Sequence, residues 1–233
     1  MRQQRTINMK TKLIRIVIAS LCWTGSVRGE TSKTGISPDR ISFYEAPLVC
    51  PAAPEIGCGS RAKPILLQLE REQSVAEAWL NRPGTIIAIV WKPEIKRKQR
   101  AATFKAVSKK EELEARELKG SARRKTLKEF GSRENWHRGS DVDRLSEEEA
   151  RIIAARLVRR IEAKVSISEE KAKRLRAEFT DLFSRRFTGT QDGDPPNVQE
   201  RVLGILRSQL DERDVALLKE TLPRTLRPLP GEQ

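Results

Sequence analysis

Two cysteines, Cys50 and Cys58, are the residues of this sequence whose type and spacing could do chemistry together. Cys58 stands at the predicted start of an amphipathic helix, between Gly57 and Gly59. Unpaired backbone N–H groups and the positive end of the helix dipole favour a thiolate there, and the thiolate is the form of cysteine that attacks disulfides and binds metals. We therefore expect function to centre on Cys58, with Cys50 as its companion thiol.

The first 29 residues have the pattern of a signal peptide. A basic stretch, residues 1–12, precedes an apolar stretch, residues 13–23, whose length suits a secretory segment better than a membrane span. Val27 and Gly29 stand where a cleavage before Glu30 requires small or permissive residues. We predict export to the periplasm or the extracellular space, or anchoring in the membrane if the segment is retained.

Export would remove Cys22 with the signal peptide and leave Cys50 and Cys58 as an even pair. In an oxidising compartment such a pair is usually a disulfide. The pair is thus a candidate structural disulfide, metal site or redox couple, and the sequence leaves these three alternatives open.

Positive charge is concentrated in one segment of the chain. The formal charge is +14, and residues 92–128 hold 14 basic residues against five acidic ones. Few apolar residues accompany these charges, which is typical of a solvated helix or a partly disordered connector. Such a connector could contact an anionic membrane surface. No base-reading motif occurs and no aromatic residues alternate with the charges, so the pattern argues against nucleic acid as a partner.

The residues after Cys58 have the periodicity of a helix followed by two strands. The helix is predicted to bury Ala62, Ile65, Leu66 and Leu69. Residues 75–80 and the β-branched run 85–91 predict strands, and turn-forming residues at 81–84 join them. The predicted order is therefore helix, strand, turn, strand.

This order resembles the heavy-metal-associated domain family over residues 56–91. Cys58, Val75, Asn81 and the strand from Thr85 stand at the spacing of that family's motif. The resemblance implies a small ferredoxin-like βαββαβ unit. It also implies that a soft ion such as copper(I) is held between two thiolates, because soft sulfur ligands suit that metal.

Two positions of the motif differ from the family. Ile56 stands where the family has methionine, and Arg61 stands where it has its second cysteine. Because a cation cannot be a metal ligand, Cys50 would have to supply the second sulfur. Arg61 would instead favour the thiolate of Cys58, which also suits a thiol–disulfide redox protein.

No classical catalytic set accompanies the thiols. The sole histidine, His137, lies in a predicted loop, and the sequence has no glycine-rich phosphate loop and no group of carboxylates at metal-binding spacing. We expect a protein that is not an enzyme, with thiol redox chemistry as the one enzymatic alternative.

Residues 145–223 predict a bundle of four helices. Three of them begin with an apolar residue and an oxygen-bearing cap, at Ser146, Ser168 and Asp211, and a fourth helix spans 198–210. Short connections between amphipathic helices favour a bundle. The helix starts resemble the Leu-Thr-x-x-Gln motifs of helical periplasmic stress and metal-sensor proteins, which implies a protein partner on the helical surface.

The expected fold class is α+β, with five parts along the chain. They are a signal peptide (1–29), a ferredoxin-like βαβ-β unit (30–91), the basic connector (92–144), the helical bundle (145–223) and a flexible tail (224–233). The favoured function is a cell-envelope binding or sensor protein that holds a soft metal ion, such as copper, through Cys50 and Cys58. The alternatives are a disulfide-stapled helical interaction module or chaperone-like protein that binds no metal, and a thiol–disulfide redox protein that uses Cys58.

Overall fold

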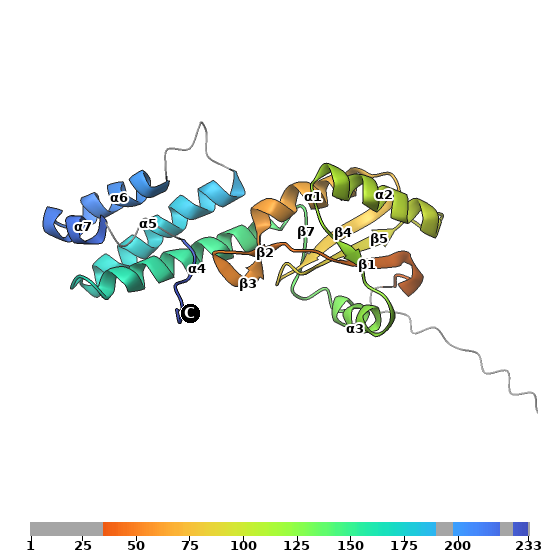
Figure 1. Cartoon of the computed structure of the whole chain (residues 1–233), viewed down its shortest axis with the longest axis horizontal. Helices are drawn as coiled ribbons and strands as arrows, with labels where there is room; N and C mark the ends of the chain where they lie inside the picture. Colours follow the sequence, from red (N-terminus) through yellow and green to blue (C-terminus); the bar gives the residue numbers. More distant parts are fainter. Residues whose placement is uncertain (1–34, 190–197, 220–225, 233) are drawn as a thin grey trace, which may run out of the picture. The chain divides into compact units, whose positions relative to one another are not determined.

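The computed structural model describes residues 35–189, 198–219 and 226–232, which all belong to one compact unit, Thr31–Gln233 (Figure 1). The predicted signal peptide and Cys22 lie outside the described residues. Within those ranges, no helix combines the length and the apolar character needed to cross a membrane.

Five strands form an antiparallel sheet in the order β6-β1-β5-β4-β7. The strand β5 is central because its β-branched residues are buried on both faces. It pairs along its length with β1, from Ile41 opposite Val90 to Glu45 opposite Ile86. The strands predicted at 75–80 and 85–91 are confirmed as β4 and β5. The bounds are β1 Ile41–Glu45, β4 Val75–Asn81, β5 Ile86–Trp91, β6 Arg116–Glu117 and β7 Trp136–Arg138.

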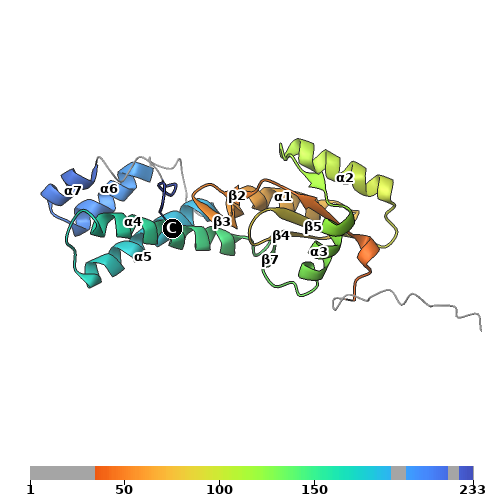
Figure 2. The same ribbon diagram turned by 60° about the horizontal axis from the view of Figure 1, so that its bottom comes forward.

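Helices cover both faces of this sheet, which confirms a mixed α+β class (Figure 2). Helices α1 (Gly59–Arg71) and α2 (Arg97–Lys110) bury apolar residues on one face, and α3 (Gly120–Phe130) packs on the other. Neighbouring side chains of β1 pack on opposite faces of the sheet, since side chains alternate along a strand. Tyr44 stacks on Phe104 of α2 at 3.5 Å between ring centroids, and Phe43 meets Phe130 of α3 edge-on at 5.6 Å.

The basic segment 92–144 differs from the predicted solvated connector, because it contributes α2, β6, α3 and β7 to the sheet and its covering layers. Its few apolar side chains are placed to be buried. Six of them are at most 8% exposed: Phe104, Val107, Leu113, Phe130, Trp136 and Val142. These side chains pack a highly charged segment into the fold, and a count of charges alone does not reveal them.

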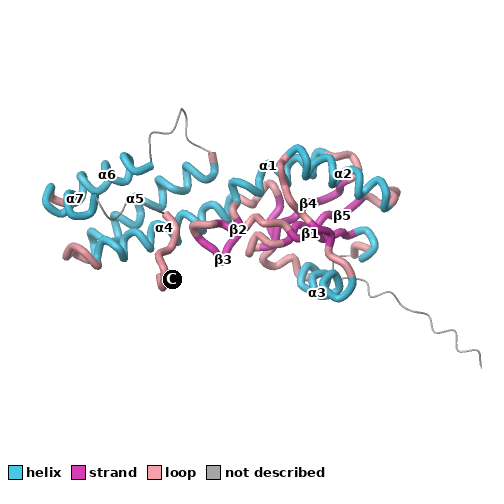
Figure 3. Tube along the Cα trace, in the orientation of Figure 1, coloured by secondary structure: helices cyan, strands magenta, loops and turns pink. Residues whose placement is uncertain are grey.

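A short hairpin separates β1 from α1. Its strands are β2 (Val49–Cys50) and β3 (Ala53–Gly57), which pair as a two-stranded sheet (Figure 3). Helix α1 then begins directly after Cys58, as predicted. The hairpin therefore returns the chain so that the residue before its turn, Cys50, lies close to the start of the helix.

The last part of the described chain is helical. It consists of α4 (Asp143–Glu162), α5 (Glu169–Thr188), α6 (Val198–Gln209) and α7 (Glu212–Lys219), which share one apolar core. Ser168 caps α5 by accepting the amide of Lys171, and Asp211 accepts the amide of Asp214 at the start of α7, so these two predicted caps are confirmed.

The third predicted cap, Ser146, is wrong. Helix α4 begins at Asp143, and Ser146 lies inside it, fully buried. The start moves toward the N-terminus because Val142 and Leu145 join the core between the sheet and α1. Helix α4 thus packs against α1 and β3 as well as against the helical core.

Candidate functional site

The two cysteines predicted to act together do lie together. Cys50 is on β2 and Cys58 is the residue before α1, and both join a small apolar cluster with Ala53 and Ile56. Their side chains hydrogen-bond to each other, and both are free thiols. Cys50 is 1% exposed and Cys58 is 7% exposed. Bulk water therefore has little access to either sulfur.

Backbone contacts fix the position of each sulfur. The amide of Cys58 donates to the carbonyl of Leu48 at 2.7 Å, which ties the helix start to the hairpin. The amide of Ala52 donates to the Cys50 sulfur at 3.3 Å, and the hydroxyl of Ser60 lies 3.3 Å from the Cys58 sulfur. Both thiols are thus held by their local surroundings before any ligand arrives.

The surroundings divide the two thiols into an ionised one and a protonated one. The hydrogen bond from Cys50 lowers the pKa of Cys58 to about 5, against the effect of burial, and the Ser60 hydroxyl and the backbone amide and charge of Arg61 lower it further. The hydrogen bond to Cys58, burial and the nearby Glu149 all raise the pKa of Cys50 far above its usual range. These opposite shifts favour Cys58 as the thiolate of the pair and Cys50 as the thiol.

Arg61 acts on Cys58 in the direction that the sequence predicts, although its side chain is turned outward. It is exposed, and its guanidinium donates to the carbonyl of Pro47 at 3.4 Å. His137 has no part in this site. It lies on β7 opposite Leu80 of β4, and burial lowers its pKa.

Helix α4 adds a buried carboxyl group, Glu149, which sequence reasoning missed. Glu149 is 5% exposed and lies close enough to Cys50 for each group to shift the other's pKa. Burial raises its pKa to about 7, and the charge of the Cys58 thiolate acts in the same direction. Within the described part of the chain, its Oε2 atom and the Ser146 hydroxyl have no hydrogen-bond partner. The available signal was an acidic residue on the apolar stripe of α4, beside Ala150 and Ile153.

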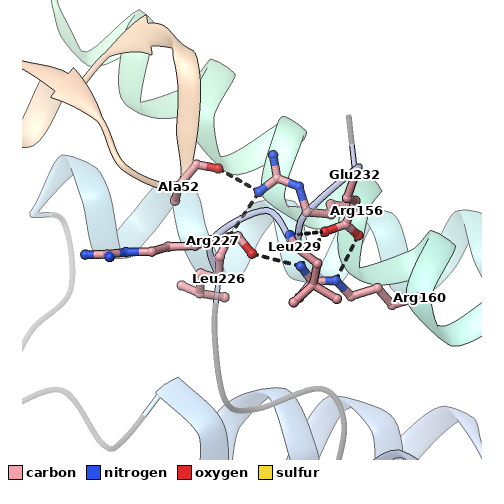
Figure 4. A network of polar contacts seen from close by, with 7 residues as sticks. All are labelled: Ala52, Arg156, Arg160, Leu226, Arg227, Leu229 and Glu232. Atoms are coloured by element: carbon pink, nitrogen blue, oxygen red, sulfur yellow. Dashed lines mark hydrogen bonds and ion pairs between the residues drawn. The ribbon is translucent and has the colours of Figure 1, made fainter.

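A tail segment, residues 226–232, is bound to the C-terminal half of α4, beyond Glu149 (Figure 4). Arg156 is 2% exposed and donates to the carbonyls of Ala52, at 2.6 Å, and Leu226, at 3.1 Å. Arg160 forms a two-point ion pair with Glu232, with distances of 2.9 and 2.6 Å. The tail predicted to be flexible is thus held in this stretch, and Arg156 links it to the turn that follows Cys50.

The described residues contain no group of three or more His, Cys, Asp and Glu side chains placed to hold a metal ion. What they contain is a pair of thiols with a buried carboxyl group beside it. Comparison with protein-family models, with curated proteins and with solved structures found no match to this chain. The chemistry of the site is therefore argued from its own residues.

Proposed function

We propose that this protein is an exported cell-envelope protein that binds one soft metal ion, such as copper(I), between Cys50 and Cys58. The observation that carries the proposal is the contact between the Cys58 thiolate at the start of α1 and the Cys50 thiol on the neighbouring hairpin. Two sulfur ligands satisfy a soft ion that accepts two-coordinate binding, whereas the hard ions prefer oxygen.

The arrangement of the sheet supports the same proposal. Leaving out the hairpin, α3 and β7, the chain runs strand, helix, strand, strand, helix, strand, in the spatial order β6-β1-β5-β4. A ferredoxin-like unit has the same βαββαβ order, which supports the proposed unit, and Cys58 stands directly before α1. In this proposal the hairpin is an insertion before α1 that brings the second sulfur, which Arg61 cannot supply.

The donor set of the site fits a soft cation. Its sulfurs are buried in one cluster, and the lowered pKa of Cys58 favours the thiolate form that a soft cation needs. Binding must displace the proton of Cys50, because the thiolate is the ligand form of cysteine. Glu149, a buried carboxyl group beside Cys50, is able to accept that proton.

The proposal is tested by titrating the reduced protein with copper(I) in competition with a chromogenic chelator. Wild type is expected to bind one equivalent, and Cys58→Ser and Cys50→Ser are each expected to lose at least about 100-fold in affinity, since one thiolate then remains. A wild type without saturable binding, or equal binding by all three proteins, would rule the metal site out.

A second candidate, thiol–disulfide exchange, is favoured by the asymmetry of the pair and by Glu149. The Cys58 thiolate would attack a substrate disulfide, break its S–S bond and release one substrate thiolate. Cys50 would then lose its proton to Glu149, attack the Cys58 sulfur and release the second substrate thiolate. The substrate leaves as two thiolates, one of which takes the proton held by Glu149 and the other a proton from water, and Cys50 and Cys58 are oxidised to a disulfide.

The two candidates, and a permanent structural disulfide, predict different thiol chemistry. Equilibration with glutathione buffers should oxidise a redox pair reversibly near the potential of its compartment. Protein isolated from the envelope with two free thiols at positions 50 and 58 would exclude a permanent disulfide. A pair that stays reduced across all glutathione ratios, yet binds copper(I), would leave the metal site as the function.

A further inference from the structure

A cavity of about 590 Å³ lies apart from the thiol pair, on the basic part of the chain. It is lined by strand β1, the 3-10 turn η1 (Pro38–Arg40), the first turn of α2 and the start of α3. The volume is within the range of small-molecule sites. Its lining includes five basic side chains: Lys96, Arg97, Arg100, Lys119 and Arg123.

Two of these basic groups are held in place by backbone carbonyls. The guanidinium of Arg100 donates to the carbonyl oxygens of Ile95, at 2.8 Å, and Asp39, at 2.5 Å. Arg123 donates to the carbonyls of Pro38, at 2.6 Å, and Ile41, at 3.1 Å. A carbonyl fixes a guanidinium without neutralising it, so both positive charges remain available at the cavity.

Acidic groups offset only part of the positive charge of this cluster. Within the described ranges, none of the five basic side chains forms a salt bridge. Two carboxylates, Asp39 and Glu117, also line the cavity. Asp39 accepts the hydroxyl of Ser37, which lowers the pKa of Asp39, and the charge of Arg100 acts in the same direction. The cavity thus retains a positive excess.

The helix starts around the cavity increase this excess. Helix α2 begins after Lys96 and α3 begins after Lys119, and neither has an acidic residue in its first turn. Positive side chains at the positive end of a helix are unfavourable, and acidic ones are the common choice. Here two helix starts that face one cavity both lack the preferred acidic residues. Such a departure is typical of a functional site, where a bound anion supplies the negative charge.

We propose that this cavity binds a small ligand that carries a phosphate group. Fixed guanidinium groups and flexible lysines recognise phosphate oxygens with charge-assisted hydrogen bonds. The cavity is larger than one phosphate requires, and Tyr44, Ile41 and Leu118 supply an apolar part that suits the organic portion of such a ligand. This site shares no lining residue with the thiol pair, so the inference is independent of the metal-binding proposal.

The test measures the binding of inorganic pyrophosphate to the full chain by isothermal titration calorimetry at low ionic strength. The double variant Arg97→Gln/Lys119→Gln removes two exposed charges that line the cavity. The control, Lys98→Gln/Arg124→Gln, removes two exposed charges from the same helices that do not line it. Wild type and control are expected to bind saturably with dissociation constants within about two-fold, and the lining variant roughly ten-fold or more weakly.

A second arm separates the two sources of phosphate. Sedimentation with phosphatidylglycerol vesicles that depends on Arg97 and Lys119, and that pyrophosphate inhibits, would identify a lipid head group as the ligand. Absence of sedimentation alongside pyrophosphate binding would identify a free phosphorylated molecule. The proposal is overturned if wild type does not bind pyrophosphate saturably, or if both double variants weaken binding equally while their circular dichroism matches wild type.

Discussion

At the scale of single residues, the hydrogen bond between Cys50 and Cys58 sets the chemistry of the site. It is the largest influence on both thiols, and it acts in opposite directions on them. The helix start and Arg61, which the sequence points to, act in the same direction on Cys58 but are secondary. The reactivity of Cys58 therefore depends chiefly on the presence of a donor at position 50.

The Cys50 donor can be removed or retained by substitution. In Cys50→Ala the pKa of Cys58 should rise from about 5 toward the ordinary value for cysteine, because the proton that stabilises the thiolate is lost. Cys50→Ser keeps a hydroxyl donor and should keep a lowered pKa. The measurement is the rate of alkylation by iodoacetamide against pH. Identical rate profiles for the alanine and serine variants would show that position 50 does not control Cys58.

Glu149 makes stability depend on pH. Its pKa rises from 4.5 to about 7 on folding, so between these values the folded protein binds a proton that the unfolded chain lacks, and stability falls as pH rises. Glu149→Gln removes this fall. Between pH 5 and pH 8 the free energy of unfolding of the variant should therefore rise by about 1–2 kcal/mol relative to that of wild type. Urea unfolding under reducing conditions measures the difference.

The lowered pKa of Cys58 contributes to stability with the opposite sign, because stability from that group is lost as pH falls toward 5. Because the Cys58 charge raises the pKa of Glu149, the difference between the two proteins reports Glu149 together with its interaction with Cys58. The exposed neighbour Glu147 provides a matched control, and Glu147→Gln should keep the wild-type pH dependence. If the free energy of unfolding depends on pH in the same way for wild type and Glu149→Gln, the ionisation of the buried carboxyl group does not affect stability.

At the scale of elements, the close approach of α1 and α4 builds the site. Gly59 makes it possible, since a Cβ atom there would overlap the hydroxyl of Ser146 and lie 2.8 Å from the carbonyl of Val142. The crossing brings the α4 face with Ser146 and Glu149 against the start of α1. A glycine next to the cysteine is therefore a packing requirement between two helices, in addition to any role in the helix start.

Gly59→Ala should destabilise the protein by about 1–3 kcal/mol, because both helices must move to admit the methyl group. The matched control is Gly204→Ala in α6, where a Cβ atom would meet nothing within 4 Å. That change should stabilise the protein by about 0.5–1 kcal/mol through better helix propensity. Urea unfolding of the two variants gives both values, and equal effects of the two substitutions would contradict the packing argument.

Elements with strong local patterns could be predicted from the sequence, and long-range assembly could not. The periodicity of residues 59–71, the β-branched run 85–91 and the caps at Ser168 and Asp211 are local signals, and the structure confirms them. The pairing of β6 with β1 and the approach of Glu149 to Cys50 depend on residues far apart in sequence. No local pattern encodes them, because tertiary packing decides which faces meet.

At the scale of the whole molecule, Arg156 joins three distant stretches of the chain. It lies on α4, and its guanidinium contacts the hairpin turn at Ala52 and the tail segment at Leu226. The neighbouring ion pair of Arg160 with Glu232 is largely buried, with side chains 11% and 19% exposed. The tail segment is thus part of the fold that supports the thiol hairpin.

Glu232→Gln should destabilise the protein by about 1–3 kcal/mol, since Arg160 then keeps a buried charge without its carboxylate partner. The exposed pair of Arg174 and Glu170, at 3.9 Å, gives the control, and Glu170→Gln should cost less than about 0.5 kcal/mol. Thermal or urea unfolding compares the two. A negligible effect of Glu232→Gln would mean that the tail segment adds nothing to stability.

The stacking of Tyr44 on Phe104 gives this protein a built-in optical reporter. Tyr44 is the single tyrosine of the sequence, and burial raises its pKa to about 12. An ionised phenol absorbs near-ultraviolet light at longer wavelength than a neutral one, so the absorbance change of the chain in alkali comes from one ring. Because that ring also lines the basic cavity, the midpoint of the change reports when a ligand fills the cavity or α2 leaves the sheet.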